Sequence, residues 1–175
     1  MYLPKWFITL LLGSGLGGLV IPQCYATGDF QRETLQRLPG VWVVVEHVAP
    51  ELATVGVTSD NLQRDTEETL RSAGLRILSQ EECWQTPGMP WLYITVALLK
   101  ATDTIYAATI AAVLNQEVQL TRSPQLKTFG VTWDAGTHLG AVSTEQLPSI
   151  QRSIRELIDK FVADYQAVNP RTRHD

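Results

Sequence analysis

The segment from Ile105 to Arg122 alternates in hydrophobicity with a period of two, and this pattern constrains the fold more than any other feature of the sequence. Its apolar side holds the even positions Tyr106, Ala108, Ile110, Ala112, Leu114, Val118 and Leu120. The odd positions become polar toward the end of the segment. Successive side chains of a β-strand point to opposite faces, so this period predicts a long strand with one covered face.

Four further segments have the composition of β-strands: 41–48, 75–78, 91–101 and 127–134. The first is apolar on both faces over its first residues, which is typical of a strand in the middle of a sheet, and the third also has apolar residues on both faces. In the last segment, alternation places Phe129, Val131 and Trp133 on one face. Gly136 and Gly140 follow and predict a turn, because glycine is the residue that most often interrupts regular structure.

Two segments have the 3.6-residue period of amphipathic helices. The first covers 58–73 and ends before Gly74, a residue common just after a helix. The second starts near Leu147 and ends at Asn169-Pro170, with a continuous apolar stripe on one side. Between the strands at 75–78 and 91–101, residues 79–90 contain two prolines and are expected to form a loop.

These elements predict an α+β, two-layer fold. We expect a mixed sheet of about five strands with two long helices on one face, in the order β-α-β-β-β-β-α. Residues 39–169 form this single domain, residues 27–38 an N-terminal arm, and residues 170–175 a flexible tail. A chain of 175 residues is consistent with one domain and little else.

The first 26 residues have the layout of a secretory signal peptide. Lys5 precedes an uncharged apolar run of fifteen residues, Phe7 to Ile21. Cys24 and Ala26 are small residues at positions −3 and −1 of a cut after Ala26. We therefore predict cleavage after Ala26 and a periplasmic or secreted protein.

Two alternatives to cleavage remain open. An uncleaved membrane anchor requires about 20 apolar residues, and this run is shorter and rich in glycine. A lipoprotein cut before Cys24 normally has a small residue just upstream, where this chain has Gln23. Contact with a membrane is expected only if the N-terminal segment is retained.

Composition and motifs exclude several classes of function. The net charge of −4 gives no sign of a nucleic-acid binder. The sequence contains no glycine-rich phosphate loop, no zinc-type spacing of cysteine and histidine, and no serine-hydrolase elbow. We expect no cofactor and no metal. Cys83, the one cysteine left after cleavage, follows two glutamates, which disfavour a reactive thiolate.

Three tryptophans are candidates for binding a partner: Trp84, Trp91 and Trp133. Trp84 lies in the proline-containing segment and is the best candidate for exposure. An exposed tryptophan is a frequent anchor in protein–protein interfaces. Trp91 and Trp133 fall on predicted strands, where packing in the core is the competing role.

The order of elements after a signal peptide resembles a class of bacterial envelope proteins. The segments that carry the likeness are 40–45 (GVWVVV), 62–75, 90–96 (PWLYITV) and the C-terminal helix. They are similar to the compact domain of the curli-secretion lipoprotein, the N-terminal part of the Tol-system translocation protein and small lipoproteins of polysaccharide export. The likeness covers most of residues 39–169 and implies a non-enzymatic part of an envelope machine. Many such proteins are lipidated, a feature from which Gln23 departs.

The sequence favours a non-catalytic exported protein that binds a protein partner or forms a homo-oligomer. One alternative is an exported hydrolase in which Glu46 or His47 meets Asp134 or His138 across adjacent strands. A second alternative is a small-ligand binder with a pocket between sheet and helices.

Overall fold

The computed structural model describes residues 29–170. The predicted signal peptide, residues 1–26, lies outside the described residues, as do residues 171–175 of the predicted tail. Within the described range, the apolar segments form four strands: β1 (Trp42–Val45), β2 (Trp91–Lys100), β3 (Ile105–Leu120) and β4 (Ser123–Ser143).

The four strands form one open sheet in the order β1-β2-β3-β4. Strand β1 is parallel to β2, while β3 is antiparallel to both of its neighbours. The expectation of a mixed sheet in an α+β fold is confirmed. The expectation of about five strands is wrong, because the segment 75–78 makes only one isolated parallel bridge, from Ile77 to Val41. Ser79 and Glu82 form a helix-starting capping box immediately afterwards, so the chain leaves the sheet there.

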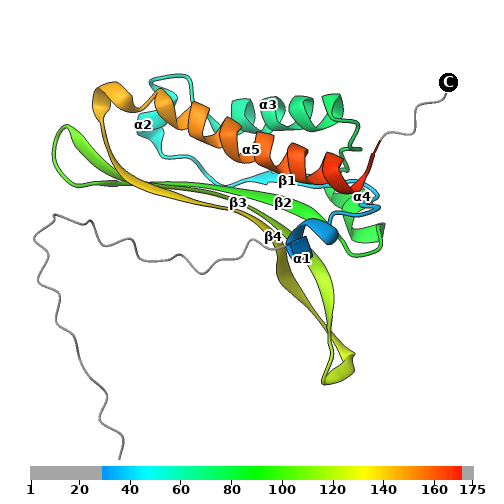
Figure 1. The fold of residues 1–175 in the computed structure, drawn as a ribbon. Coiled ribbons are helices and arrows are strands. Elements are labelled where there is room, and N and C mark those ends of the chain that lie inside the picture. The colour runs from blue at the N-terminus through cyan, green and yellow to red at the C-terminus, as the bar shows by residue number, and fades with distance from the viewer. Residues whose placement is uncertain (1–28, 171–175) are drawn as a thin grey trace, which may run out of the picture.

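Helices α3 (Ser59–Ser72) and α5 (Ser149–Val168) cover one face of the sheet (Figure 1). The shorter helices are α1 (Asp29–Glu33), α2 (Pro50–Ala53), α4 (Gln80–Gln85) and the 3₁₀ turn η1 (Thr144–Gln146). Helix α4 corrects the expected loop at 79–90. No helix in the described part of the chain has the length and apolar character needed to cross a membrane.

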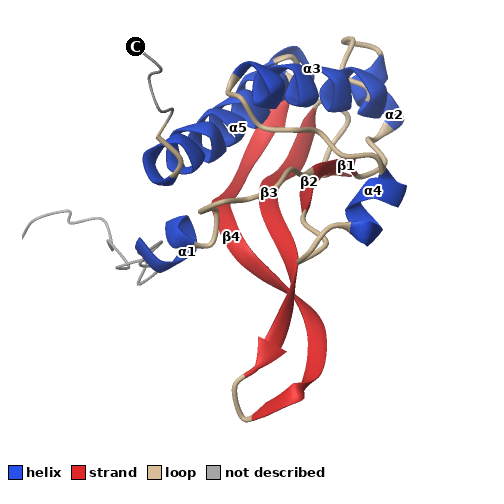
Figure 2. Ribbon diagram, turned by 90° about the vertical axis from the view of Figure 1, so that its right-hand side faces the viewer, coloured by secondary structure: helices blue, strands red, loops and turns tan. Residues whose placement is uncertain are grey.

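The core lies between the sheet and the two long helices. Alternate residues of β2 (Leu92, Ile94, Val96) and of β3 (Ile110, Ala112, Leu114) are buried on this side. Their partners come mainly from α5 and α3, with Phe161 and Leu70 fully buried. The opposite side, here called the open face, is not covered by α3 or α5 (Figure 2).

Two bulges in β4 change which way its side chains point. Val131 pairs with Asn115 and Trp133 with Leu114, so one extra residue lies between them. Val131 therefore points to the open face together with Phe129, whereas Trp133 points to the core, which corrects the prediction that all three share one face. A second register shift falls at Gly136, whose φ of 96° suits glycine. Residues 136–140 belong to β4, so the predicted turn there is wrong.

Strands β3 and β4 continue past the end of β2 as a two-stranded projection (Figures 1 and 2). Pairing between β2 and β3 ends at Trp91 and Asn115. Residues 116–130, here called the distal ribbon, therefore have only each other as strand neighbours. The Lys127 ammonium group lies 2.7 Å from the Glu117 carboxylate across the ribbon.

Candidate functional site

Three aromatic side chains from distant parts of the chain meet at the base of the distal ribbon. Phe129 of β4 packs edge-on against Trp91 of β2, with 4.9 Å between ring centroids. It also lies 6.4 Å from the ring of Trp84 in α4. Trp84 is 48% exposed and Phe129 is 46% exposed. We call Trp84, Trp91 and Phe129 the aromatic cluster.

The position of Trp84 depends on the buried cysteine beside it. Cys83 is only 1% exposed, and its thiol donates a 3.4 Å hydrogen bond to the carbonyl of Pro90. Burial raises the pKa of this thiol. A protonated, covered thiol has little nucleophilic reactivity, so Cys83 anchors α4 to the start of β2. The next residue along the helix, Trp84, is thereby presented to solvent.

The loop between α4 and β2 is also attached to the distal ribbon. The amide of Glu117 donates a 2.7 Å hydrogen bond to the carbonyl of Gly88. Gly88 has a φ of 82°, which favours glycine at that turn. These contacts place α4, the first residue of β2 and the base of the ribbon next to one another.

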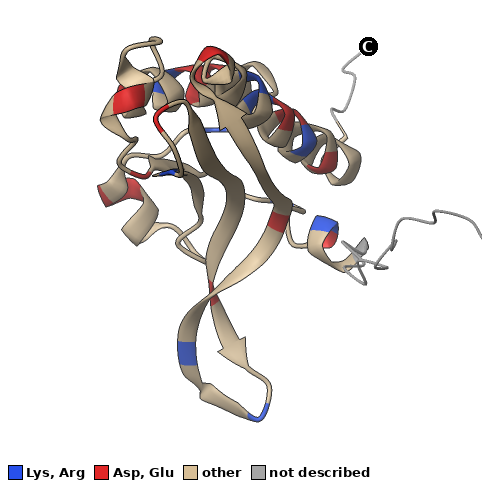
Figure 3. Cartoon of the chain, turned by 90° about the vertical axis from the view of Figure 1, so that its left-hand side faces the viewer, with Lys and Arg blue, Asp and Glu red and all other residues tan. Residues whose placement is uncertain are grey.

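The open face around the aromatic cluster is largely uncharged. Within the four strands, the Lys, Arg, Asp and Glu residues are Lys100, Glu117, Lys127 and Asp134. Figure 3 shows many of the other charged positions on the helices. A surface with few charges and with exposed aromatic rings is typical of a contact surface for another macromolecule.

Tyr93, which follows Trp91 by two residues on the open face, has a raised pKa. Burial is the largest cause, and Glu46 adds to it because its negative charge repels the phenolate and its carboxylate accepts a hydrogen bond from the neutral phenol. The phenol therefore stays protonated at neutral pH and acts as a hydrogen-bond donor. The Glu46 carboxylate supplies a charge at the β1 end of this face.

Trp133 does not contribute to this surface. Its side chain is 1% exposed and packs edge-on against Phe161 of α5 at 4.9 Å. Its indole N–H donates a 3.0 Å hydrogen bond to Asp164. We therefore assign Trp133 to the core and retain Trp84 and Trp91 from the three predicted tryptophans.

Asp164 is the centre of a polar network above Trp133. Its carboxylate accepts hydrogen bonds from Lys160 at 2.9 Å and from the Arg32 guanidinium at 2.9 Å, in addition to the indole. Partial burial opposes ionisation, but the donors Lys160, Trp133 and Arg32 outweigh it and lower the pKa of this carboxyl group. The network joins the N-terminal segment to α5 and therefore has a structural role.

The four residues proposed for a hydrolase are not brought together. Glu46 and His47 follow β1, whereas Asp134 and His138 lie in β4, at the other edge of the sheet. Two strands separate them, a distance of about 14 Å at the usual strand spacing. General acid–base catalysis requires hydrogen-bond contact, so these residues cannot act as one catalytic group. In residues 29–170, no cluster of three His, Cys, Asp or Glu residues is placed to hold a metal ion.

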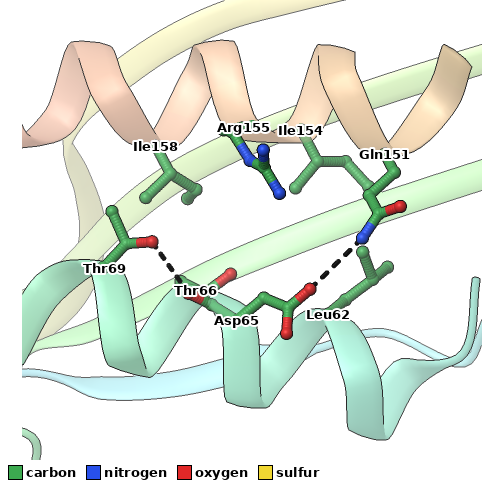
Figure 4. Close-up of a pocket in the computed structure, with 8 residues that line it drawn as sticks. All are labelled: Leu62, Asp65, Thr66, Thr69, Gln151, Ile154, Arg155 and Ile158. Atoms are coloured by element: carbon green, nitrogen blue, oxygen red, sulfur yellow. Dashed lines mark hydrogen bonds between the residues drawn. The ribbon is translucent and has the colours of Figure 1, made fainter.

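A small cavity lies between α3 and α5 (Figure 4). Its volume is about 20 Å³, which is enough for roughly one water molecule. The side-chain amide of Gln151 donates a 3.2 Å hydrogen bond to Asp65 across it. The space between the two helices therefore does not admit a metabolite.

Phe129 was not among the residues singled out from the sequence. Alternation groups Phe129 with the buried Trp133, and only the bulge between Val131 and Trp133 separates them. Non-local pairing with Glu117 then places Phe129 beside Trp91. When compared with known protein families, with curated proteins and with solved structures, the chain matches none of them.

Proposed function

We propose that this is an exported, non-catalytic protein that binds a partner protein in envelope assembly or transport, and that the aromatic cluster is the contact. The observation that carries the proposal is the exposure of Trp84 and Phe129 beside Trp91, next to an open face that carries few charges. Burying exposed aromatic rings supplies much of the free energy of protein association. The distal ribbon beside the cluster enlarges the surface that a partner protein can contact.

The shape of the distal ribbon also supports partner binding. A two-stranded ribbon is marginally stable by itself, since it has no covered face to bury its apolar side chains. Leu126 and Phe129 of the ribbon are both exposed, as is Val131 at its base. A partner that packs on the open face would bury Phe129 and Val131 together with Trp84 and Trp91.

Crosslinking from position 84 tests the proposal. We expect a photoreactive benzoylphenylalanine at Trp84 to give a discrete, reproducible adduct in intact cells, at about tenfold the yield of the same group at Val55. Val55 is exposed in the loop after α2 and is the matched control. Equal, diffuse labelling at the two positions would count against binding at the cluster.

A paired substitution separates binding from folding. Trp84→Ala removes an exposed ring, so we expect a loss of stability below about 1 kcal/mol by thermal or urea unfolding. The adduct formed from a photoreactive group at Leu126 should nevertheless fall at least tenfold in this variant, as expected for an interface anchor worth about 2 kcal/mol. Retention of the adduct with native stability would show that Trp84 is not an anchor.

Export is part of the same proposal and has its own test. We expect the chain expressed from Met1 in a Gram-negative host to be recovered in the periplasm with Thr27 as its first residue. Intact-mass measurement and N-terminal sequencing give the answer directly. A chain that starts at Cys24 with an added lipid would indicate the lipoprotein route, and one that starts at Met1 would indicate an anchor or no export.

A further inference from the structure

Strand β4 is an edge of the sheet and is 21 residues long. An edge strand directs alternate N–H and C=O groups away from its one neighbour, and these groups are satisfied by water, by other parts of the chain or by another strand. Proteins usually block such edges with charges, prolines, bulges or covering segments. The blocking features of this sheet are unevenly distributed along its edges.

Most of the exposed edge is blocked. Near the middle of β4, the segment after α1 covers the edge, where the Thr34 hydroxyl donates to the carbonyl of Thr132 and the Asp134 amide donates to Gln31. The distal part of β4 carries Pro124 and Lys127, two residues that disfavour strand addition.

The edge at β1 is blocked as well. Ile77 forms an isolated parallel bridge with Val41, the residue just before β1. The Ser59 hydroxyl then binds the Glu46 carbonyl and the Val48 amide just beyond its end. Only a short piece of the four-residue β1 is left between these contacts, too little to pair stably with another strand.

Two stretches remain: the part of β2 beyond Ile94, which has no strand on its β1 side and ends in the charged Lys100, and the part of β4 from Thr137 to Val142, here called the bare edge. Its sequence, THLGAV, contains no proline and no Lys, Arg, Asp or Glu. Among the described residues, its main chain has no hydrogen bond other than those of the ladder with β3. Leu139 is 78% exposed on the open face, and Ala141 is exposed beside it. In a single chain, water must therefore solvate both the outward N–H and C=O groups of this edge and the apolar side chain of Leu139.

We propose that the bare edge pairs with the bare edge of a second copy of this chain, antiparallel and related by a two-fold axis. In such a pairing each residue lies opposite a residue of the same segment, so any charge near the axis would meet a like charge. The bare edge contains no Lys, Arg, Asp or Glu, and this composition permits self-pairing. Two copies of Leu139 then meet on the joined open face and become covered.

The surface on the helix side of the bare edge accommodates the second copy. Ala108 and Gly140 are small, and with His138, Val142 and Ser153 they line a shallow hollow beside the strand. Pairing over six residues is short, so the dimer is expected to be weak, with a dissociation constant in the range of about 1–100 µM.

Mass measurement tests the proposal on the full chain as processed by its host. We expect the average mass to rise from one chain toward two between about 1 and 200 µM by analytical ultracentrifugation. Leu139→Lys places a charge next to its symmetry mate, so the dissociation constant should rise about tenfold or more. Leu99→Lys is the matched control, because Leu99 is 72% exposed on the open face of β2, which β3 separates from β4, and the substitution should leave the mass unchanged.

Cysteine crosslinking gives an independent measurement of the pairing. Single cysteines at Thr137, Leu139 and Ala141 share the open face, and we expect at least one to form a disulfide-linked dimer on mild oxidation. A cysteine in place of Leu99 should form no disulfide-linked dimer under the same conditions. A single-chain mass at 200 µM, or equal dimerisation of the parent and Leu139→Lys, overturns the proposal.

The bare edge and the aromatic cluster are different surfaces, so the inference does not rest on the proposed partner binding. If Trp84→Ala abolishes the dimer while Leu139→Lys does not, the second copy binds at the aromatic cluster and the edge pairing is overturned. If Leu139→Lys alone abolishes it, the edge pairing stands whatever the outcome of crosslinking from position 84.

Discussion

Replacing Trp133 with alanine is expected to lower the free energy of unfolding by about 3–5 kcal/mol. The indole is 1% exposed and fills the space beside Phe161 at the centre of the contact between β4 and α5. Its removal leaves a cavity in the core and leaves the Asp164 carboxylate without one of its donors. Urea unfolding followed by far-UV circular dichroism measures the change.

A milder substitution separates the packing of Trp133 from its hydrogen bond, even if the alanine variant does not fold. Trp133→Phe keeps most of the apolar volume but removes the indole N–H, at an expected cost of about 1.5–3 kcal/mol at neutral pH. Trp84→Ala, which removes an exposed indole, is the control. A loss below 1 kcal/mol for Trp133→Ala would contradict the buried position of this ring.

The pH dependence of the stability of the parent and of Trp133→Phe tests whether Asp164 is ionised in the folded chain. The pKa of Asp164 is lower in the folded chain than in the unfolded chain, so its stabilising effect is complete above the unfolded pKa of about 3.9. This effect is lost as the pH falls through the folded value. The stability difference between the parent and Trp133→Phe should therefore shrink below about pH 4, and a constant difference would indicate that the charge is not involved.

Replacing Ile94 with alanine is expected to cost about 2–5 kcal/mol, whereas Thr95→Ala should cost less than about 1 kcal/mol. The two residues are adjacent in β2, but Ile94 is fully buried beneath the helices and Thr95 lies on the open face. The comparison tests the two-layer arrangement, because a sheet covered on both sides would make both substitutions costly. Chemical unfolding of the two variants under identical conditions gives the two losses of stability to be compared.

The outcome for Thr95 also bears on the proposed function. If the open face is covered only in a complex, Thr95→Ala leaves the isolated chain nearly unchanged. A loss above 2 kcal/mol at Thr95 in the isolated chain would indicate that the open face is already covered, and it would weaken the case for a binding surface there.

Local pattern predicted much of the fold because each element carries its own periodic signal. The alternation after Ile105 identifies β3 almost to its last residue, Leu120. The apolar stripe from Leu147 identifies α5, and the Leu62 to Ala73 pattern identifies α3. A helix at 80–85 was missed because six residues are too few for a period, although Ser79 and Glu82 carry the spacing of a capping box.

The candidate site could be predicted only in part. Trp84 was recognised because it lies outside the periodic segments, where exposure is common. Phe129 was not, since its side of β4 depends on a bulge that only pairing with β3 reveals. The separation of Glu46 from Asp134 could likewise not be predicted, because the order of strands in a sheet depends on contacts between distant parts of the chain.

The sequence by itself determined the types of the long elements, which of their faces are apolar, and the two-layer class, because these follow from side-chain periods of two and 3.6 residues. The tertiary structure alone decided three things: the bulge that separates Val131 from Trp133, the meeting of the aromatic cluster, and the part of the β4 edge that stays bare. Each of these depends on which strands lie side by side. That choice is made by contacts between residues far apart in the chain, which no local period encodes.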